Sequence, residues 1–196
     1  MRKTLFIAAA GLLLFGCRPN YMPKQMGYYR IDTPLKHEYQ VFDRPGYPYT
    51  FEYPSYARIE IDTQFFKEKA DNPYWININY YTLGGILNLT YKPIKSAADF
   101  FKMNQETYKF TFFHHEKADF INDETFMFPD NHIYYTLYTV GGNAASRYQF
   151  TATDTTSHFL FGSLYFDVTP NADSLKPVTD FLIQDINHMI ETLKFR

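Results

Sequence analysis

The fold is decided by residues 75–91, which read WININYYTLGGILNLTY. Apolar and polar residues alternate on both sides of Gly84-Gly85, so that Ile76, Ile78 and Tyr80 share one face of the first run. Alternation with a period of two is typical of a strand with one buried face. Two such runs around a Gly-Gly turn predict a β-hairpin.

Further strands are predicted on both sides of this hairpin, because alternating runs recur between clusters of turn residues. They are expected at residues 58–62, 119–128, 133–140, 146–153 and 158–168, with turns at 141–143 and 154–157. Adjacent strands joined by short turns imply a sheet that is mainly antiparallel.

Two helices are predicted beside the strands. Ser96 has the position of an N-cap for a central helix that ends near His114, and Asp173 or Ser174 caps a long C-terminal helix. The C-terminal helix carries an apolar stripe at helical spacing, which must dock on the sheet. We therefore predict an α+β fold, with one central and one long C-terminal helix packed on a mainly antiparallel sheet.

Three polar residues follow one another at helical spacing on the C-terminal helix. Asp185, His188 and Glu191 lie three residues apart, a spacing that could bring a histidine and a carboxylate to one metal ion. On a helical projection they move progressively off the flank of the apolar stripe towards solvent. A surface row of hydrogen-bonding groups is therefore the preferred interpretation, and no metal is expected.

The N-terminus predicts export and lipid attachment. Arg2-Lys3 precedes an apolar run over residues 5–15, which is too short for a membrane-spanning helix of ~20 residues. The run ends in Leu14-Phe15-Gly16-Cys17, which is similar to a bacterial lipobox, and Cys17 is the only cysteine. We expect Cys17 to carry acyl chains, palmitate among them, that hold the protein on a membrane. The alternative is an ordinary cleaved signal followed by an incidental cysteine.

These features divide the chain into three parts. Residues 1–16 are expected to be a lipoprotein signal peptide. Residues 17–48 contain the lipidated cysteine and a proline-rich tether and irregular lead-in. Residues 49–196 are expected to form a single α+β domain.

Charge and composition exclude two classes of protein. The chain has 19 Lys and Arg against 21 Asp and Glu, and loss of Arg2 and Lys3 with the signal leaves 17 against 21. A chain with this acidic balance has no electrostatic basis for wrapping nucleic acid. The 20 Phe and 18 Tyr residues can fill a core, which excludes intrinsic disorder.

The most concentrated polar cluster is Asn143, Ser146, Gln149, Asp154 and His158. Ser146, His158 and Asp154 are the residue types of a hydrolase triad, but a triad is defined by geometry. The alternative is structural, with Asn143 and Asp154 in turns and with Ser146 and His158 beginning strands. No P-loop, nucleophile elbow or H-E-x-x-H zinc motif is present, so no catalytic residue, cofactor or metal is predicted. The five residues remain candidates for binding a partner or ligand.

Blocks of sequence follow one another along nearly the whole mature chain. They include Trp75-Ile76-Asn77-Ile78 and Gly142-Asn143-x-Ala145-Ser146, and the full set lies at residues 21–31, 48–57, 75–78, 114–118, 142–154, 158–166, 170–178 and 188–192. Together with the lipobox, these blocks resemble the GldD family, lipoproteins of the gliding-motility apparatus of Bacteroidetes bacteria. Phe161 departs from the pattern, because a basic residue is expected there.

The resemblance implies a non-catalytic accessory or assembly role in gliding motility and in the linked type IX secretion system. The implied partners are other envelope lipoproteins. Residues 18–24 contain no acidic residue, which within this phylum favours the periplasmic face of the outer membrane, with the inner membrane as the alternative. The predicted elements are similar to PsbP/Mog1-type α-β-α sandwiches. The alternative function is a ligand-binding or hydrolytic envelope protein that acts on glycan or peptide through the region between Asn143 and His158.

Overall fold

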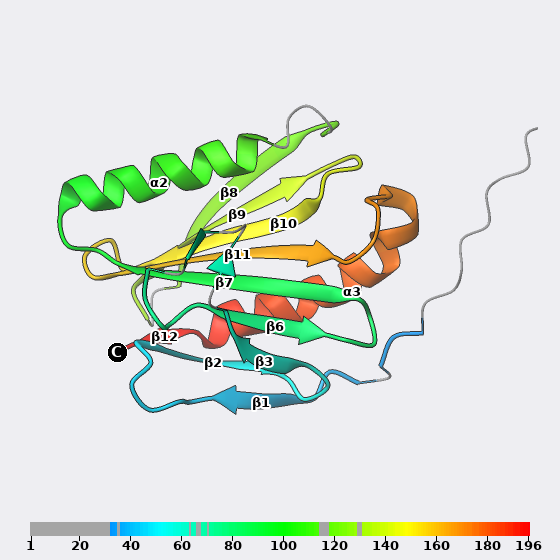
Figure 1. The fold of residues 1–196 in the computed structure, drawn as a ribbon, viewed down its shortest axis with the longest axis horizontal. Coiled ribbons are helices and arrows are strands. Elements are labelled where there is room, and N and C mark those ends of the chain that lie inside the picture. The colour runs from blue at the N-terminus through cyan, green and yellow to red at the C-terminus, as the bar shows by residue number, and fades with distance from the viewer. Residues whose placement is uncertain are drawn as a thin grey trace, which may run out of the picture.

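The computed structural model describes residues 32–34, 36–62, 64–65, 68–69, 71–113, 118–128 and 131–196. They form a seven-stranded antiparallel sheet in the order β3-β6-β7-β11-β10-β9-β8, a three-stranded sheet in the order β1-β2-β12, and the small hairpin β4-β5 (Figure 1). The helices are α2 (Ala97–Phe112) and α3 (Ala172–Thr192). The strands are β1 (Tyr39–Phe42), β2 (Tyr49–Pro54), β3 (Arg58–Ile61), β4 (Gln64–Phe65), β5 (Glu68–Lys69), β6 (Ile76–Tyr80), β7 (Gly85–Pro93), β8 (Ile121–Phe128), β9 (Ile133–Val140), β10 (Ser146–Thr153), β11 (His158–Phe166) and β12 (Lys194–Phe195).

The hairpin predicted from residues 75–91 is confirmed. β6 and β7 pair antiparallel, with Tyr80 opposite Gly85, and Gly84 in the turn has a φ of 65° that favours glycine. Ile76 and Ile78 are completely buried on one face, as their alternation predicted. Strands β9 and β10 also begin and end where the sequence predicted them.

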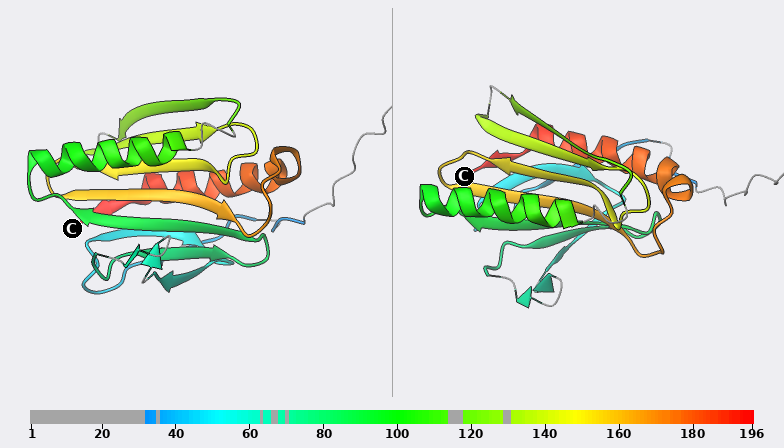
Figure 2. Two further views of the ribbon diagram at one scale, coloured as in Figure 1. Left: turned by 45° about the horizontal axis from the view of Figure 1, so that its top comes forward. Right: turned by 90° about the horizontal axis from the view of Figure 1, so that it is seen from above.

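The two helices cover opposite faces of the seven-stranded sheet (Figure 2). The side chains of β11 contact α2 on one face of the sheet and the core beneath α3 on the other. Phe161 packs against Phe110 of α2 with ring centroids 5.5 Å apart, while Leu160 and Leu164, on the other face, join the core that α3 completes. Because successive side chains of a strand point to opposite faces, a strand buried on both faces is apolar throughout. The mainly antiparallel α+β fold is thus confirmed, in an α-β-α arrangement.

The helix starts test the capping predictions. Ser96 is the N-cap of α2, and its hydroxyl accepts a hydrogen bond from the Asp99 N–H at 3.1 Å. For α3 the predicted cap was wrong, since the cap is Asn171 and its side chain accepts from the Ser174 N–H. Asn is as good a cap as Asp or Ser, so three adjacent candidates could not be separated by residue type.

The lead-in predicted to be irregular contains a strand. β1 pairs with β2, and β12 at the C-terminus pairs with the other edge of β2. This smaller sheet lies beside α3 on the same side of the larger sheet (Figure 2). Its residues Phe42 and Phe51 bury their rings in the main hydrophobic core. The short runs in β1 and β12 carry too few residues for a periodic pattern. They become strands only because β2 is there to pair with them.

No described helix is long and apolar enough to cross a membrane.

Candidate functional site at the junction of the lead-in and the last helix

The most unusual polar side chain of the described structure is Asp185 on α3, which is completely buried. Its Oδ1 accepts hydrogen bonds from Nδ1 of His37 at 2.6 Å and from the Tyr39 hydroxyl at 3.1 Å. Its Oδ2 accepts from the hydroxyl of Tyr56. A buried carboxylate is costly unless its oxygens are satisfied, and here each oxygen has a donor.

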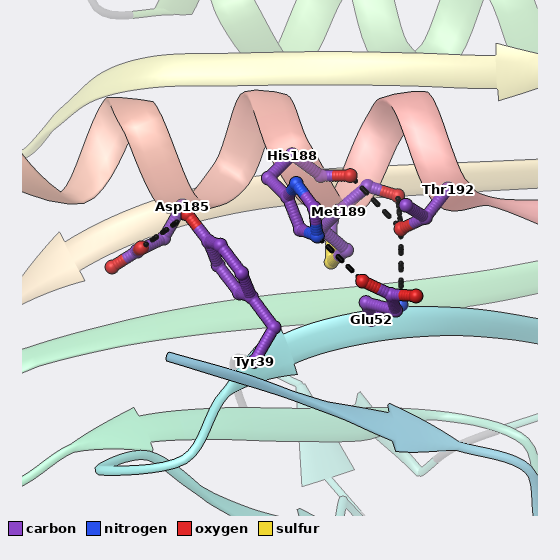
Figure 3. Close-up of polar contacts among 6 residues, drawn as sticks. All are labelled: Tyr39, Glu52, Asp185, His188, Met189 and Thr192. Carbon is purple, nitrogen blue, oxygen red and sulfur yellow. Dashed lines mark hydrogen bonds and ion pairs between the residues drawn. The ribbon is translucent and has the colours of Figure 1, made fainter. Parts of the chain in front are cut away.

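His188 lies one helical turn further along α3 and extends this arrangement (Figure 3). Its ring stacks on Tyr39, with centroids 3.6 Å apart, and its Nε2 lies 2.7 Å from Oε2 of Glu52 on β2. The Glu52 backbone N–H also donates to the hydroxyl of Thr192, at 3.0 Å. We call the group His37, Tyr39, Glu52, Tyr56, Asp185 and His188 the lead-in junction.

The lead-in junction connects the first described residues to the last helix. His37 and Tyr39 come from the lead-in and β1, Glu52 from β2, and Asp185 from α3, so partners nearly 150 positions apart meet. His37 also stacks on Phe181 of α3, with ring centroids 4.4 Å apart. The arrangement fixes the segment around His37 and Tyr39 against the body of the domain.

Burial changes the acidity of the tyrosines in this group. Burial, together with the charge and hydrogen bond of Asp185, raises the pKa of Tyr39 to about 12. The same causes, burial first, raise the pKa of Tyr56. Both phenols therefore remain protonated donors to Asp185 across the physiological range of pH.

The domain is expected to lose stability steeply as the pH rises above 10. Burial raises the pKa of Tyr49, Tyr80 and Tyr135, so the folded state holds protons that the unfolded state releases. The stabilisation from these protons is complete below pH 10. Above pH 10, each of the three phenols lowers the free energy of unfolding by about 1.4 kcal/mol per pH unit. Denaturant midpoints at pH 8, 10 and 11 measure the effect, to which these three phenols should contribute roughly 4 kcal/mol at pH 11, with Tyr39 and Tyr56 adding to it. Tyr49→Phe is the control and should make the decline shallower; equal stability at pH 8 and pH 11 would contradict the prediction.

The prediction that Asp185, His188 and Glu191 form a solvent-facing row was wrong for Asp185. The projection correctly placed Asp185 on the flank of the apolar stripe. That flank is covered by the lead-in and β2, which a projection of the helix alone does not contain. A possible signal was the position of Asp185, three residues after Leu182 and four before Met189, both buried. Glu191 is exposed, as predicted.

The lead-in junction has the properties of a structural connection. Both oxygens of Asp185 are used by protein donors, and His188 is occupied by Glu52 and Tyr39. Within the described residues, no group of three or more His, Cys, Asp or Glu side chains could hold a metal ion. The adjacent residues His114, His115 and Glu116, which are also of metal-ligand types, lie outside the described residues.

The structure does not bring the five predicted binding residues to one place. Ser146 begins β10, whereas Asp154 and His158 lie at its other end, in the turn to β11 and at the start of that strand. Eight strand residues separate these ends by roughly 20 Å. The geometry therefore gives no support to a triad of Ser146, His158 and Asp154.

Asp154 and His158 are held by local and cross-sheet contacts. Oδ1 of Asp154 accepts from the N–H groups of Thr156, Ser157 and His158, at 3.0, 2.8 and 2.8 Å. Burial alone would raise the pKa of Asp154, but these three donors outweigh it and hold that pKa below its ordinary value. Nδ1 of His158 lies 2.8 Å from the Tyr91 hydroxyl, and its ring stacks on Phe195.

Of the other three residues, Asn143 and Ser146 lie at the opposite end of the β10–β11 hairpin, and Gln149 lies in the middle of β10. Asn143 accepts a hydrogen bond from the Ala172 N–H at 2.9 Å, which ties the β9–β10 turn to the start of α3. Gln149 is completely buried and accepts from Thr111 of α2 at 2.8 Å. Ser146 is also completely buried, opposite Tyr165 of β11. These contacts position α2 and α3 on the sheet.

A cavity of about 200 Å³ lies between α2 and the sheet. Aromatic and mixed side chains line it, among them Trp75, Lys92, Phe110 and Phe161. Phe161, where the sequence departs from the expected basic residue, is 8% exposed and packs under α2. The cavity is smaller than the ~300 Å³ at which small-molecule sites begin, so we assign it no ligand.

The fold and the lead-in junction define an α+β domain whose N-terminal lead-in is fixed to its last helix. The family model described as "Gliding motility lipoprotein GldD" matches residues 18–195, and the chain belongs to this family. Among solved structures, the chain is similar to the solution structure of cyanobacterial PsbP (CyanoP) from Synechocystis sp. PCC 6803. The identity is 13%, the match covers 82% of this chain and 94% of that one, and the TM-score is 0.48. None of the curated proteins compared matches the sequence.

Proposed function

We propose that this protein is a membrane-anchored envelope lipoprotein and a non-catalytic accessory component of the gliding machinery and the linked type IX secretion system. The observation that carries the proposal is the match of the gliding-motility lipoprotein family to residues 18–195. The proposed anchor is the acylated Cys17, and the proposed partners are other envelope lipoproteins. The proposed location is the periplasmic face of the outer membrane, supported by the absence of acidic residues in 18–24.

The lead-in junction supports an anchoring role. Fifteen positions separate Cys17 from Asp32, so a lipid on Cys17 would hold Asp32, the first described residue, within roughly 50 Å of the membrane. His37 and Tyr39, five and seven positions further along the chain, contact α3 through the buried carboxylate of Asp185. In this proposal the lead-in junction is a connection through which force on the anchor reaches the body of the domain.

The positions of the candidate residues support a role through contact with other proteins. The alternative, a ligand-binding or hydrolytic function through the region between Asn143 and His158, requires these residues to act together. Ser146 and His158 lie at opposite ends of one hairpin, and Asn143 and Gln149 are used in contacts with the helices.

Cys17→Ala is expected to release the protein from the membrane and to abolish gliding, with an unchanged thermal midpoint. Acyl chains provide the membrane affinity in this proposal, and each buried methylene contributes ~0.8 kcal/mol. Membrane fractionation, a gliding assay and cross-linked affinity capture from intact membranes measure the outcome. Capture should recover another envelope lipoprotein with the wild type and lose it with the variant.

Asn20→Ala keeps the cysteine and is the matched control, which should stay on the membrane and support gliding. A Cys17→Ala protein that is soluble in cells that still glide would refute the anchored role.

A further inference from the structure

β8 (Ile121–Phe128) is the last strand of the seven-stranded sheet, with β9 on one side. Among the described residues, no strand pairs with its outer edge, and Figure 2 shows it as the outermost strand. In an antiparallel edge strand, about half of the backbone N–H and C=O groups point away from the neighbouring strand. Such an edge can accept another strand.

The side chains of β8 combine a fixed row with an exposed row. Phe126 stacks on Tyr135 with ring centroids 5.5 Å apart, and Phe128 packs edge-on against the same ring, so one row is held by the core. On the other face, Met127 is 42% exposed beside Tyr134, which is 44% exposed. The strand is thus held in an extended form, with an apolar surface next to its free edge.

The charge of this edge is of one sign. The sequence has no Lys or Arg between Lys117 and Arg147, whereas it has Asp119, Asp123, Glu124 and Asp130 there. Asp123 and Glu124 lie in the middle of β8 and are exposed. Opposite charges on paired strands stabilise the pair, and like charges destabilise it. The edge therefore favours a strand that carries Lys or Arg.

A second copy of the chain fits this edge poorly. If β8 paired antiparallel with itself about its centre, Glu124 would lie opposite Thr125 of the other copy. Asp123 of each copy would then be the diagonal neighbour of Glu124 of the other copy on the same face, which brings like charges together. Acidic residues on an edge strand disfavour such self-pairing, which leaves a basic partner as the occupant.

We propose that the outer edge of β8 binds one extended basic segment of a partner protein, which adds to the sheet as an eighth strand. The backbone of β8 supplies the hydrogen bonds, Asp123 and Glu124 select Lys or Arg, and Met127 and Tyr134 receive an apolar side chain. This edge lies at the opposite end of the molecule from β1, which is the first described strand after the proposed anchor at Cys17 (Figure 1). A partner strand and the membrane can thus be engaged at the same time.

The test uses the mature lipoprotein in detergent micelles and an eight-residue peptide that alternates lysine with valine or tyrosine, matched to the length of β8. We expect it to bind and to slow hydrogen exchange of β8 amides. Asp123→Lys with Glu124→Lys should weaken binding about tenfold, since Asp123 and Glu124 point to opposite faces and the pair on the lysine face of the peptide becomes repulsive. The same peptide with glutamate in place of lysine should show the reverse preference. Methylation of alternate peptide nitrogens should abolish binding, because added strands need those N–H groups.

Glu60→Lys with Asp167→Lys is the matched control. It makes the same change in charge at exposed positions away from β8, one of them on β3 at the other edge of the sheet, and should leave binding unchanged. The proposal is overturned if the basic peptide does not bind, if it binds equally well after N-methylation, or if exchange slows elsewhere. If the β8 variant does not fold, the comparison of the N-methylated and unmethylated peptides on the wild-type protein still tests whether the peptide adds as a strand. A binding assay on purified protein is independent of gliding, so its failure is distinct from that of the Cys17 experiment.

Discussion

Asp185→Ala is expected to destabilise the domain by about 3–5 kcal/mol, the range for removing one partner of a buried charged pair. The substitution leaves His37, Tyr39 and Tyr56 without the acceptor on which their donors converge. It also leaves a cavity in the flank of α3, where Asp185 is completely buried. For a chain of this size the thermal midpoint should fall by about 10 °C. Chemical denaturation and thermal melting measure the effect.

Two further variants make the result specific. Asp185→Asn keeps the size of the side chain but gives up its charge, so it should recover less than half of the loss. Glu191→Ala removes an exposed carboxylate from the same helix and should change stability by no more than about 0.5 kcal/mol. If Asp185→Ala cost less than about 1 kcal/mol, water would be satisfying the three donors. The lead-in junction would then not fix the lead-in to α3.

Gly162→Ala is expected to cost about 3 kcal/mol, because the centre of β11 has no room for a methyl group. A Cβ at Gly162 would lie 2.1 Å from Cε1 and 2.3 Å from Cζ of Phe150, the residue opposite it on β10. Phe150 is completely buried, so its ring cannot turn away without displacing the core. The free energy of unfolding measures this cost.

Gly141→Ala is the matched control. A Cβ there would lie 2.3 Å from Cε1 of Phe120, a similar approach, but Phe120 is 49% exposed and can move into solvent. We expect a cost below about 1 kcal/mol at Gly141. Combining Gly162→Ala with Phe150→Leu should restore part of the lost stability, because the shorter side chain removes the contact. Equal losses at Gly162 and Gly141 would contradict the packing argument.

Local features of the sequence predicted much of the fold. The alternation around Gly84-Gly85 predicted β6 and β7, and the limits of β9 and β10 were correct at both ends. Ser96 was correctly predicted as an N-cap. These features depend on the period of a strand, on turn residues and on one side-chain hydrogen bond, all of which act over a few positions. The resemblance to the GldD family also extends along the chain, and the family match confirmed it.

The candidate site was less predictable. Asn143, Ser146, Gln149, Asp154 and His158 are close in sequence, but an extended hairpin spreads them from one of its ends to the other. The residues of the lead-in junction come from segments that are far apart in sequence, and no pattern predicted that these segments meet. Glu52, Tyr56 and His188 lie in blocks that carry the family resemblance, but the blocks do not show which residues contact one another. His37 was not singled out at all, because a histidine in a lead-in has no characteristic partner.

The strands of the seven-stranded sheet, the turns between them, the two helices and the family could all be predicted from the sequence, because each depends on neighbouring residues or on the order of sequence blocks. The burial of Asp185, the existence of β1 and β12 as strands, and the absence of a strand on the outer edge of β8 among the described residues could be read only from the three-dimensional arrangement. Burial and strand pairing depend on what lies against a surface. Asp185 is covered by the lead-in, nearly 150 positions away, and β12 pairs with β2 from the other end of the chain, so no local pattern contains this information.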